Sequence, residues 1–181
     1  MSIHITYFVH GTTTDNEKDV ATGWHDGELS ELGKKQSIEL GSQVKDKKFD
    51  VVFCSDLKRA IDSAQLAFGS LYTIITDKRL REANYGIYTG NISSSFKNNL
   101  PEYISKPFPD GESYHDIEKR IGDFIYFLKE NYDGKHIAIV AHQAPQLAIE
   151  VLLNKKSWEQ AIEEDWRNTK SWKPGWEYVV E

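Results

Sequence analysis

The chain is short of cysteine and has no long apolar run, and both shortages narrow the class of protein. Its 181 residues include one cysteine, Cys54, so no disulfide can form within the chain. No stretch reaches the ~20 consecutive apolar residues of a membrane span, and no basic and apolar leader precedes the first strand candidate. The sequence argues against a disulfide-rich secreted scaffold and a membrane protein. We expect a cytoplasmic protein with no membrane partner.

Positive charge is also in short supply. Lys and Arg number 22 against 28 Asp and Glu, which gives a net charge of −6. A broad nucleic-acid surface needs a basic face, so we expect no nucleic-acid partner, although a local positive pocket for a phosphate remains possible. The hydrophobic share of 39% is enough for one domain that buries ~70% of its unfolded surface. We therefore expect a single domain over 1–181 that acts on a small molecule.

Short apolar runs alternate with amphipathic stretches, which is the pattern of a parallel sheet covered by helices on both faces. Strands are predicted at 3–9, 50–54, 72–76, 136–141 and 176–180. Helices are predicted at 30–44, from Ser55 or Asp56 to 67, at 113–131 and at 144–153. The expected fold class is α/β, a three-layer αβα sandwich with a mostly parallel central sheet.

Two segments depart from this alternation. The stretch 88–110 is rich in Ser, Asn and Pro, which is typical of a loop, and we predict that this short insertion forms a lid over a site. Four of the five tryptophans lie in the C-terminal 158–176. Aromatic residues that alternate with charged ones usually pack a helix onto the core, so we favour a structural role for these tryptophans over a ligand-stacking surface.

Chemically useful side chains follow four of the predicted strands. His10 comes directly after the first strand and His142 directly after the fourth. Arg59 lies in the first turn of the helix after the second strand, and Glu82 follows the third. Open α/β sheets bind ligands outside the carboxyl ends of their strands, so we expect these four side chains to converge on one small molecule.

Two imidazoles, a guanidinium and a carboxylate form a set suited to phosphoryl transfer. A neutral imidazole can attack phosphorus, a guanidinium can hold two charged oxygens at once, and a carboxylic acid can protonate the leaving oxygen. Each residue also has a structural alternative. A histidine can be a satisfied buried residue, Arg59 can form a surface ion pair, and Glu82 can accept backbone hydrogen bonds in a turn.

The same residues lie in blocks that resemble the histidine phosphatase superfamily, the phosphoglycerate mutase-like group. The matching blocks, in order, are HGTTTDN at 10–16, LSELGKKQ at 29–36, SDLKRA at 55–60, LREANYG at 80–86 and GES at 111–113. His142 matches the second histidine of the family. Several blocks in matching order are far more specific than one short motif.

The resemblance implies a phosphohistidine mechanism. His10 would be the nucleophile and Glu82 the proton donor and later the base, while His142 and Arg59 would hold the phosphoryl group. Further substrate-binding candidates are Gly11, Thr12, Asn16, Arg81 and Gln143. The resemblance implies no metal and no organic cofactor. The leading expectation is a metal-independent phosphatase that hydrolyses a small phosphate monoester.

The chain departs from the family pattern at Val9, where the family carries an arginine directly before the catalytic histidine. A lost transition-state donor typically costs ~10²–10³ in rate, so weakened activity is expected. Arg81, with Lys58 or Arg79, is a candidate source of replacement charge. Gln143 is a second departure, because the family has a small residue there, and its amide could replace a lost donor or obstruct the pocket.

Two other functions remain open at this point. The loss of the arginine favours a pseudophosphatase that binds a phosphorylated ligand or a protein partner without turnover. A phosphoglycerate mutase is disfavoured, because mutases of this group carry a long basic insertion, whereas 88–110 contains only Lys97 and Lys106. The oligomeric state cannot be derived from the pattern.

Overall fold

Five strands form one mixed sheet in the computed structural model, which describes residues 2–181. The strands are β1 (Ile3–Val9), β2 (Val51–Cys54), β3 (Ile74–Thr76), β4 (His136–Ala141) and β5 (Trp176–Val180), in the order β3-β2-β4-β1-β5. Only the edge strand β5 runs antiparallel to its neighbour, and the other pairs are parallel. The sheet is therefore mostly parallel, as the sequence predicts.

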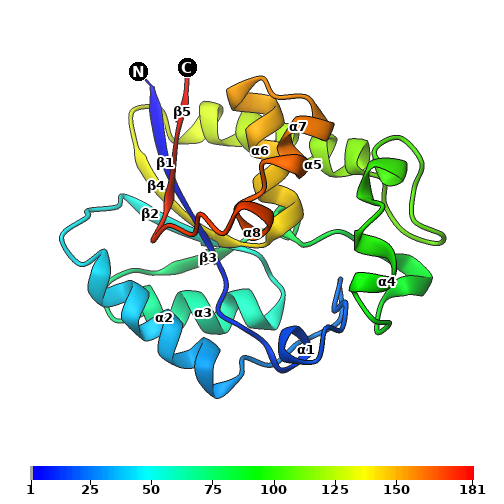
Figure 1. Cartoon of the computed structure of the whole chain (residues 1–181). Helices are drawn as coiled ribbons and strands as arrows, with labels where there is room; N and C mark the ends of the chain where they lie inside the picture. Colours follow the sequence, from blue (N-terminus) through cyan, green and yellow to red (C-terminus); the bar gives the residue numbers. More distant parts are fainter. Residues whose placement is uncertain (1) are drawn as a thin grey trace.

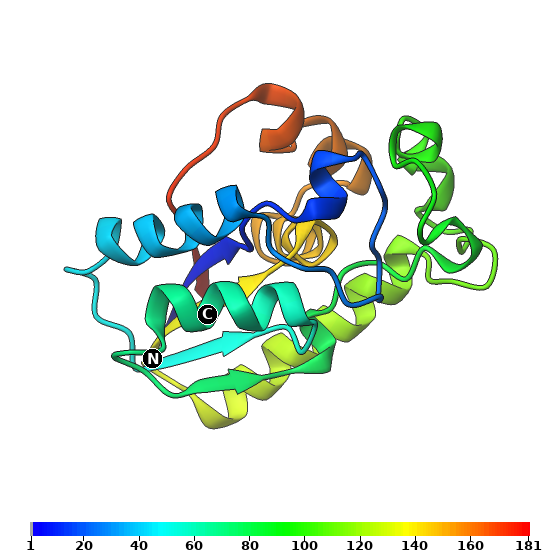
Figure 2. The same cartoon turned by 90° about the horizontal axis from the view of Figure 1, so that it is seen from below.

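Helices cover both faces of this sheet. α2 (Glu31–Gln43) and α3 (Lys58–Phe68) lie against one face, and α5 (Tyr114–Asn131) and α6 (Gln143–Asn154) lie against the other (Figure 1). The view from below shows the strands between these two helical layers (Figure 2). The predicted three-layer α/β fold is confirmed.

The alternation of side chains along each strand divides the core into two parts. Tyr7, Phe53 and Ile139 belong to the cluster that contains the apolar faces of α5 and α6. Phe8 and Val140, one residue further along, belong to the cluster with α2 and α3. Successive strand residues point to opposite faces, so each short apolar run is buried on both sides.

Cys54 lies at the end of β2 in the cluster with α2 and α3, where it is fully buried. Burial raises the pKa of its thiol to about 12, so the thiolate needed for reaction is scarce at neutral pH. The only cysteine of the chain is thus a small core residue, as its apolar surroundings in the sequence indicate.

The helix starts follow the predicted caps in two cases of three. Ser30 caps α2 through the Gly33 N–H, and Ser113 caps α5 in a capping box. The prediction for α3 is wrong, because this helix begins at Lys58 after Leu57, without a side-chain cap. Asp56 binds Arg81 instead.

The predicted insertion contains more structure than a loop. It begins at the last residue of η2 (Gly86–Tyr88) and holds the short helices α4 (Ser94–Lys97) and η3 (Leu100–Tyr103). Its aromatic side chains pack together, with the rings of Tyr103 and Phe108 stacked at 4.0 Å. The aromatic residues in this polar segment therefore build a small core of their own, and its function as a lid stays a prediction.

The C-terminal segment adds α7 (Trp158–Glu163) and α8 (Trp166–Thr169) before the chain enters β5. Trp158 is buried and donates its indole N–H to Glu118 at 2.7 Å, which is the expected structural role. The other short elements are α1 (Thr14–Glu17) and η1 (Lys78–Leu80). None of the helices described here is long and apolar enough to cross a membrane.

Candidate active site

The parallel pairing of β1 with β4 brings the two histidines together. Val9 lies opposite Ala141 in the ladder, and the His10 N–H continues it by donating to the Ala141 carbonyl at 3.0 Å. The residues that follow these strand ends are therefore neighbours. The ring centroids of His10 and His142 are 5.0 Å apart, with an interplanar angle of 61°.

The hydrogen bonding of His10 leaves one ring nitrogen free to react. Nδ1 lies 2.7 Å from the Gly11 carbonyl oxygen, which can only accept, so Nδ1 carries the proton and Nε2 the lone pair. Burial and the charge of Arg59 lower the pKa of His10 to about 3. The ring is therefore neutral at physiological pH, which is the state that a nucleophile requires.

His142 is fully buried, and both of its ring nitrogens lack a hydrogen-bond partner among the residues that the structure describes. Its backbone is held firmly, because the Tyr7 hydroxyl donates to the His142 carbonyl at 2.6 Å and accepts from the His142 N–H at 3.0 Å. Burial and the Arg59 charge keep the pKa of His142 well below its usual value. A buried polar ring without a partner is rare and fits a residue that waits for a ligand oxygen.

Glu82 lies at the N-terminus of α6. Its two carboxylate oxygens accept from the backbone N–H groups of Ala83 (2.9 Å), Ala144 (3.0 Å) and Gln143 (3.3 Å). Burial raises the pKa of this carboxyl, but Lys97, the backbone donors and Arg59 outweigh burial and hold the pKa below its usual value. Glu82 therefore does accept backbone hydrogen bonds, which was the structural alternative, and these bonds also fix its carboxylate at the edge of the sheet.

Arg59 stands in the first turn of α3 with only 2% of its surface exposed. Its guanidinium donates to the carbonyls of Gly23 (2.8 Å) and His25 (3.1 Å) in the loop that crosses the site. Burial lowers the pKa of Arg59, and Glu82 opposes the change. A cation fixed by backbone carbonyls is pre-aimed, so binding an anion needs little reorganisation.

The loop after β1 is built by close backbone contacts. A side chain on Gly11 would place its Cβ 2.3 Å from the Gly33 carbonyl oxygen, so only glycine allows this loop to pack on the start of α2. The Gly11 N–H donates to Ser63, and the Thr12 N–H to Gln36. Asn16 uses its side-chain oxygen in the capping box of α1. Apart from the Gly11 carbonyl, which accepts from His10, these hydrogen bonds of Gly11, Thr12 and Asn16 hold the loop and its neighbouring helices.

The three cations that we considered as replacements for the missing arginine each form an ion pair with an acidic side chain. Arg81 forms a two-pronged pair with Asp56 at 2.7 Å and lies over the Trp24 ring. Arg79 pairs with Asp77 at 2.6 Å, and Lys58 pairs with an acidic neighbour on α3. The structure therefore does not bring the predicted substitute, Arg81, to the histidine pair.

Three cations outside the candidate set act electrostatically on the site, namely Lys97, Arg120 and Arg167. Lys97 of α4 is the charge that most strongly lowers the pKa of Glu82, against the opposing effect of burial. Arg167 of α8 contributes to the low pKa values of both histidines, after burial and Arg59, and for His142 also after His10 and Arg120. Gln143 donates its side-chain amide to Asp165, the residue that binds Arg167. Lys97 lies in the insertion between two of the matching blocks and Arg167 lies after the last of them, so none of the blocks contains either residue.

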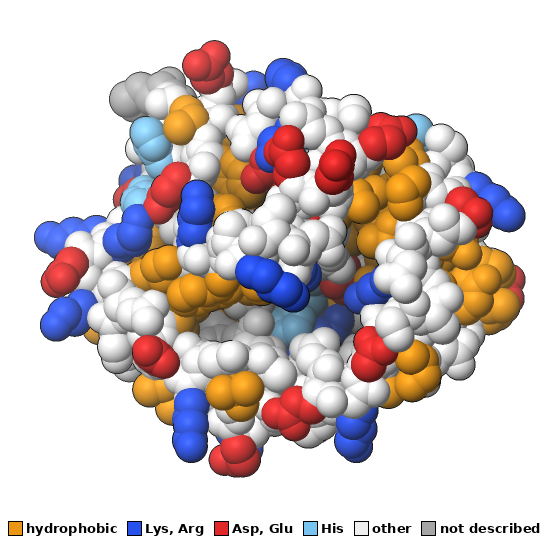
Figure 3. Space-filling view, viewed as in Figure 1, with side chains coloured by type: hydrophobic (Ala, Val, Ile, Leu, Met, Phe, Trp, Pro, Cys, Tyr) orange, Lys and Arg blue, Asp and Glu red, His pale blue; other side chains and the backbone are white. Residues whose placement is uncertain are grey.

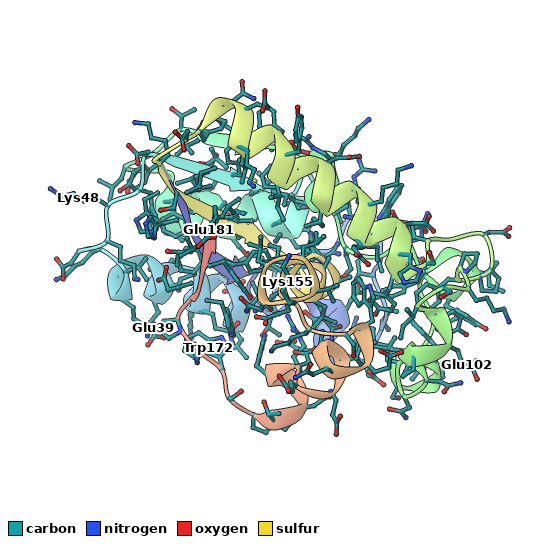
Figure 4. All side chains as sticks on the ribbon, turned by 90° about the horizontal axis from the view of Figure 1, so that it is seen from above. Glu39, Lys48, Glu102, Lys155, Trp172 and Glu181 are labelled. Atoms are coloured by element: carbon teal, nitrogen blue, oxygen red, sulfur yellow. The ribbon has the colours of Figure 1, made fainter. Side chains whose placement is uncertain are left out.

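A cavity of about 390 Å³ opens beside His10. Val9, Thr12 and one side of α2 form part of its lining, and Trp166 and Trp172 form another part. Figure 3 shows a hollow in this face with a histidine side chain at its base and hydrophobic side chains on its rim, and Figure 4 shows Trp172 close to Glu39 of α2. Two tryptophans of the C-terminal segment thus line the cavity beside His10, which the structural interpretation of that segment misses.

The mostly parallel α/β fold and the paired histidines at the edge of its sheet agree with the family match. Residues 7–173 match the histidine phosphatase superfamily (branch 1), and the chain belongs to this family. A Hydrogenobacter thermophilus protein with a provisional phosphoserine phosphatase name is 32% identical over 80% of this chain and 75% of its own length. A 2,3-bisphosphoglycerate-dependent phosphoglycerate mutase from Allorhizobium ampelinum is 29% identical over 84% and 80%.

Solved structures agree with the fold. A mycobacterial glucosyl-3-phosphoglycerate phosphatase superposes with a TM-score of 0.77 at 23% identity, covering 90% of this chain and 84% of its own. The two sequence relatives carry enzyme names, so they give no support to the alternative of a pocket without turnover. Among residues 2–181, no group of three or more His, Cys, Asp or Glu side chains is arranged to hold a metal ion.

Proposed function

We propose that this protein is a metal-independent phosphatase that hydrolyses a small phosphate monoester through a phosphohistidine on His10. The observation that carries the proposal is the histidine pair. Nδ1 of His10 is hydrogen-bonded to the Gly11 carbonyl, which directs reaction to Nε2. The centroid of the His142 ring, whose nitrogens have no hydrogen-bond partner among the described residues, lies 5.0 Å from that of His10. A neutral nucleophile next to a buried ring that lacks a partner suits attack on a phosphoryl group.

The first half-reaction forms one bond and breaks one. The Nε2 lone pair of His10 bonds to phosphorus as the bond between phosphorus and the leaving oxygen breaks. The leaving oxygen keeps that electron pair and takes a proton from Glu82. Arg59 and His142 bind the equatorial oxygens, where negative charge is spread in the transition state.

The second half-reaction returns the enzyme to its starting state. The Glu82 carboxylate takes a proton from water as the water oxygen bonds to phosphorus, and the nitrogen–phosphorus pair returns to Nε2. Three backbone N–H groups hold the Glu82 carboxylate, which leaves lone-pair capacity for the transferred proton. Inorganic phosphate is the second product.

Hydrolysis is favoured over a mutase reaction by the charges of the insertion. A mutase must hold a second anionic group while the phosphoryl group moves, which requires several cations beyond the transfer site. The insertion offers Lys97, whose charge acts on Glu82, and Lys106, which is exposed. Water is therefore the proposed acceptor, with the insertion as a lid.

Trapping the intermediate tests this function. After brief incubation with a ³²P-labelled aryl phosphate and a quench in alkali, we expect label on the wild-type chain that is stable in alkali and lost in acid, as a phosphoramidate is. His10→Ala should remove the label, whereas His4→Ala, an exposed histidine on the same strand, should keep it. Phosphate release that survives His10→Ala, or that stops on removal of a metal ion, would contradict the proposal.

A further inference from the structure

A network of side-chain hydrogen bonds at the start of α8 holds Arg167 in place. Asp165 is almost fully buried and accepts from Arg167 Nη1 at 2.8 Å and from the Arg167 N–H at 3.1 Å. The side-chain amide of Gln143, the first residue of α6, also donates to Asp165. The network therefore ties Arg167 to the residue that follows His142, although the two lie 24 positions apart in the chain.

The same network places Arg167 beside the cavity. Its guanidinium carbon lies 4.4 Å from the centre of the Trp166 ring, and Trp166 lines the cavity together with His10. The Trp166 ring is itself fixed, because it stacks on Trp176 at 5.6 Å and donates to Gln146 at 3.3 Å. Arg167 is thus a partly exposed cation on a fixed support at the edge of the site.

The family pattern predicts a second cation at this cavity. By resemblance to the family, the residue before the nucleophile should be an arginine, and this chain has Val9, whose apolar side chain lines the same cavity. Arg81, Arg79 and Lys58 are occupied by acidic partners. Arg167 differs from them, because its positive charge helps to lower the pKa values of both histidines, after burial and Arg59, and for His142 also after His10 and Arg120.

We propose that Arg167 is the second phosphate-binding cation of this site, supplied by the C-terminal segment in place of the arginine that Val9 replaces. Asp165 engages Nη1, so Nε and Nη2 carry the donors for two oxygens of one phosphoryl group. Gln143 and Asp165 are positioning residues that limit the freedom of the guanidinium. This inference rests on the proposed function, because it assigns a residue to the same phosphoryl site.

The test measures binding of orthovanadate, an oxyanion of the shape of the transferred group, separately from turnover. Arg167→Gln is expected to weaken vanadate binding and to lower kcat/KM for an aryl phosphate, each by about 10- to 100-fold. Lys170→Gln is the matched control, because it removes the same charge from an exposed position three residues along the segment. Equal affinity in wild type and Arg167→Gln, or an equal loss in both variants, would overturn the proposal.

Two further variants separate a phosphate contact from a merely structural role. Arg167→Lys keeps the charge but loses the paired donors of the guanidinium, so we expect a vanadate affinity between those of the wild type and Arg167→Gln. An affinity equal to that of the wild type would count against the proposal. Adding Val9→Arg to Arg167→Gln should restore vanadate binding, because it returns a cation to the cavity from β1. A wild type that binds vanadate through Arg167 without hydrolysing esters would instead refute the proposed function and leave the Arg167 contact standing.

Discussion

The four strand-end side chains and the two outer cations are held in different ways. His10, Glu82 and Arg59 bond through their side chains to backbone groups, and Tyr7 pins the backbone of His142. The outer cations depend on other side chains, which for Arg167 are Asp165 and Trp166 and for Lys97 is the Tyr85 ring at 5.1 Å. Backbone contacts fix the strand-end groups within the fold itself, whereas the positions of the outer cations depend on the side chains that contact them.

The largest expected effect concerns a strand-end residue, Glu82. Glu82→Gln should lower kcat/KM for an alkyl phosphate by about 10²- to 10⁴-fold, since its poor leaving group needs a proton. For 4-nitrophenyl phosphate, whose leaving group needs no proton, the loss should be much smaller. Glu102→Gln is the control, because Glu102 is exposed at the far end of the insertion (Figure 4). Equal losses for both substrates would remove Glu82 as the acid.

The pH profile gives the same residue a second test. The pKa of Glu82 lies below its usual value, so in the free enzyme the protonated acid becomes scarcer as the pH rises. For the alkyl phosphate, kcat/KM should therefore increase as the pH falls from 7 toward 5, by up to about tenfold per unit. The difference in slope between wild type and Glu82→Gln isolates this carboxyl from the titration of the substrate. Parallel profiles would contradict the assignment.

Arg59 should come next in size. Arg59→Met is expected to lower kcat by about 10²- to 10³-fold, because it removes a fixed cation at the developing charge. It also leaves the carbonyls of Gly23 and His25 without this donor, so the melting temperature should fall as well. Arg79→Met removes an arginine that pairs with Asp77 and lies over Phe127, and it should affect stability alone. An Arg59→Met enzyme with the kcat of wild type would contradict the assignment of Arg59 to the strand-end residues that act on the phosphoryl group.

A smaller effect is expected at Lys97. Lys97→Gln should raise kcat/KM for the alkyl phosphate at pH 7 by less than about tenfold, since this cation acts through Glu82 in our account and its loss leaves more of that carboxyl protonated. Its loss removes a charge that lowers the pKa of Glu82, so the profile for the alkyl phosphate should move to higher pH. Lys106→Gln, an exposed lysine of the same insertion, should leave the profile unchanged. A shift to lower pH in Lys97→Gln would contradict this electrostatic account.

A separate effect, on stability rather than activity, is expected in acid. Both histidines have pKa values below the ordinary 6.5 in the folded state, to about 3 for His10, so the unfolded chain binds protons first as the pH falls. The free energy of unfolding should therefore decrease below about pH 6.5, by on the order of 1 kcal/mol per pH unit for each histidine. Urea titrations at several pH values measure this slope. His10→Asn should reduce it and the exposed His4→Asn should not, and identical slopes would refute the burial argument.

The sequence by itself determined the order of strands and helices and the placement of His10, Arg59, Glu82 and His142 after strands. Both follow from local periodicity, because a parallel sheet must present the carboxyl ends of its strands at one edge. The sequence also identified the caps of α2 and α5, where Ser30 and Ser113 stand directly before the helix. For α3 the same rule selected Ser55 or Asp56, and the contact of Asp56 with Arg81 took precedence.

Only the tertiary structure decided which charges surround the strand-end residues. Arg81 is near Glu82 in sequence but binds Asp56, whereas Arg167 is distant in sequence and lies by the cavity. It also decided that Trp158 packs in the core while Trp166 and Trp172 line the cavity beside His10. Long polar and aromatic side chains take their partners from whichever segments the packed fold brings near, and that choice depends on the whole chain.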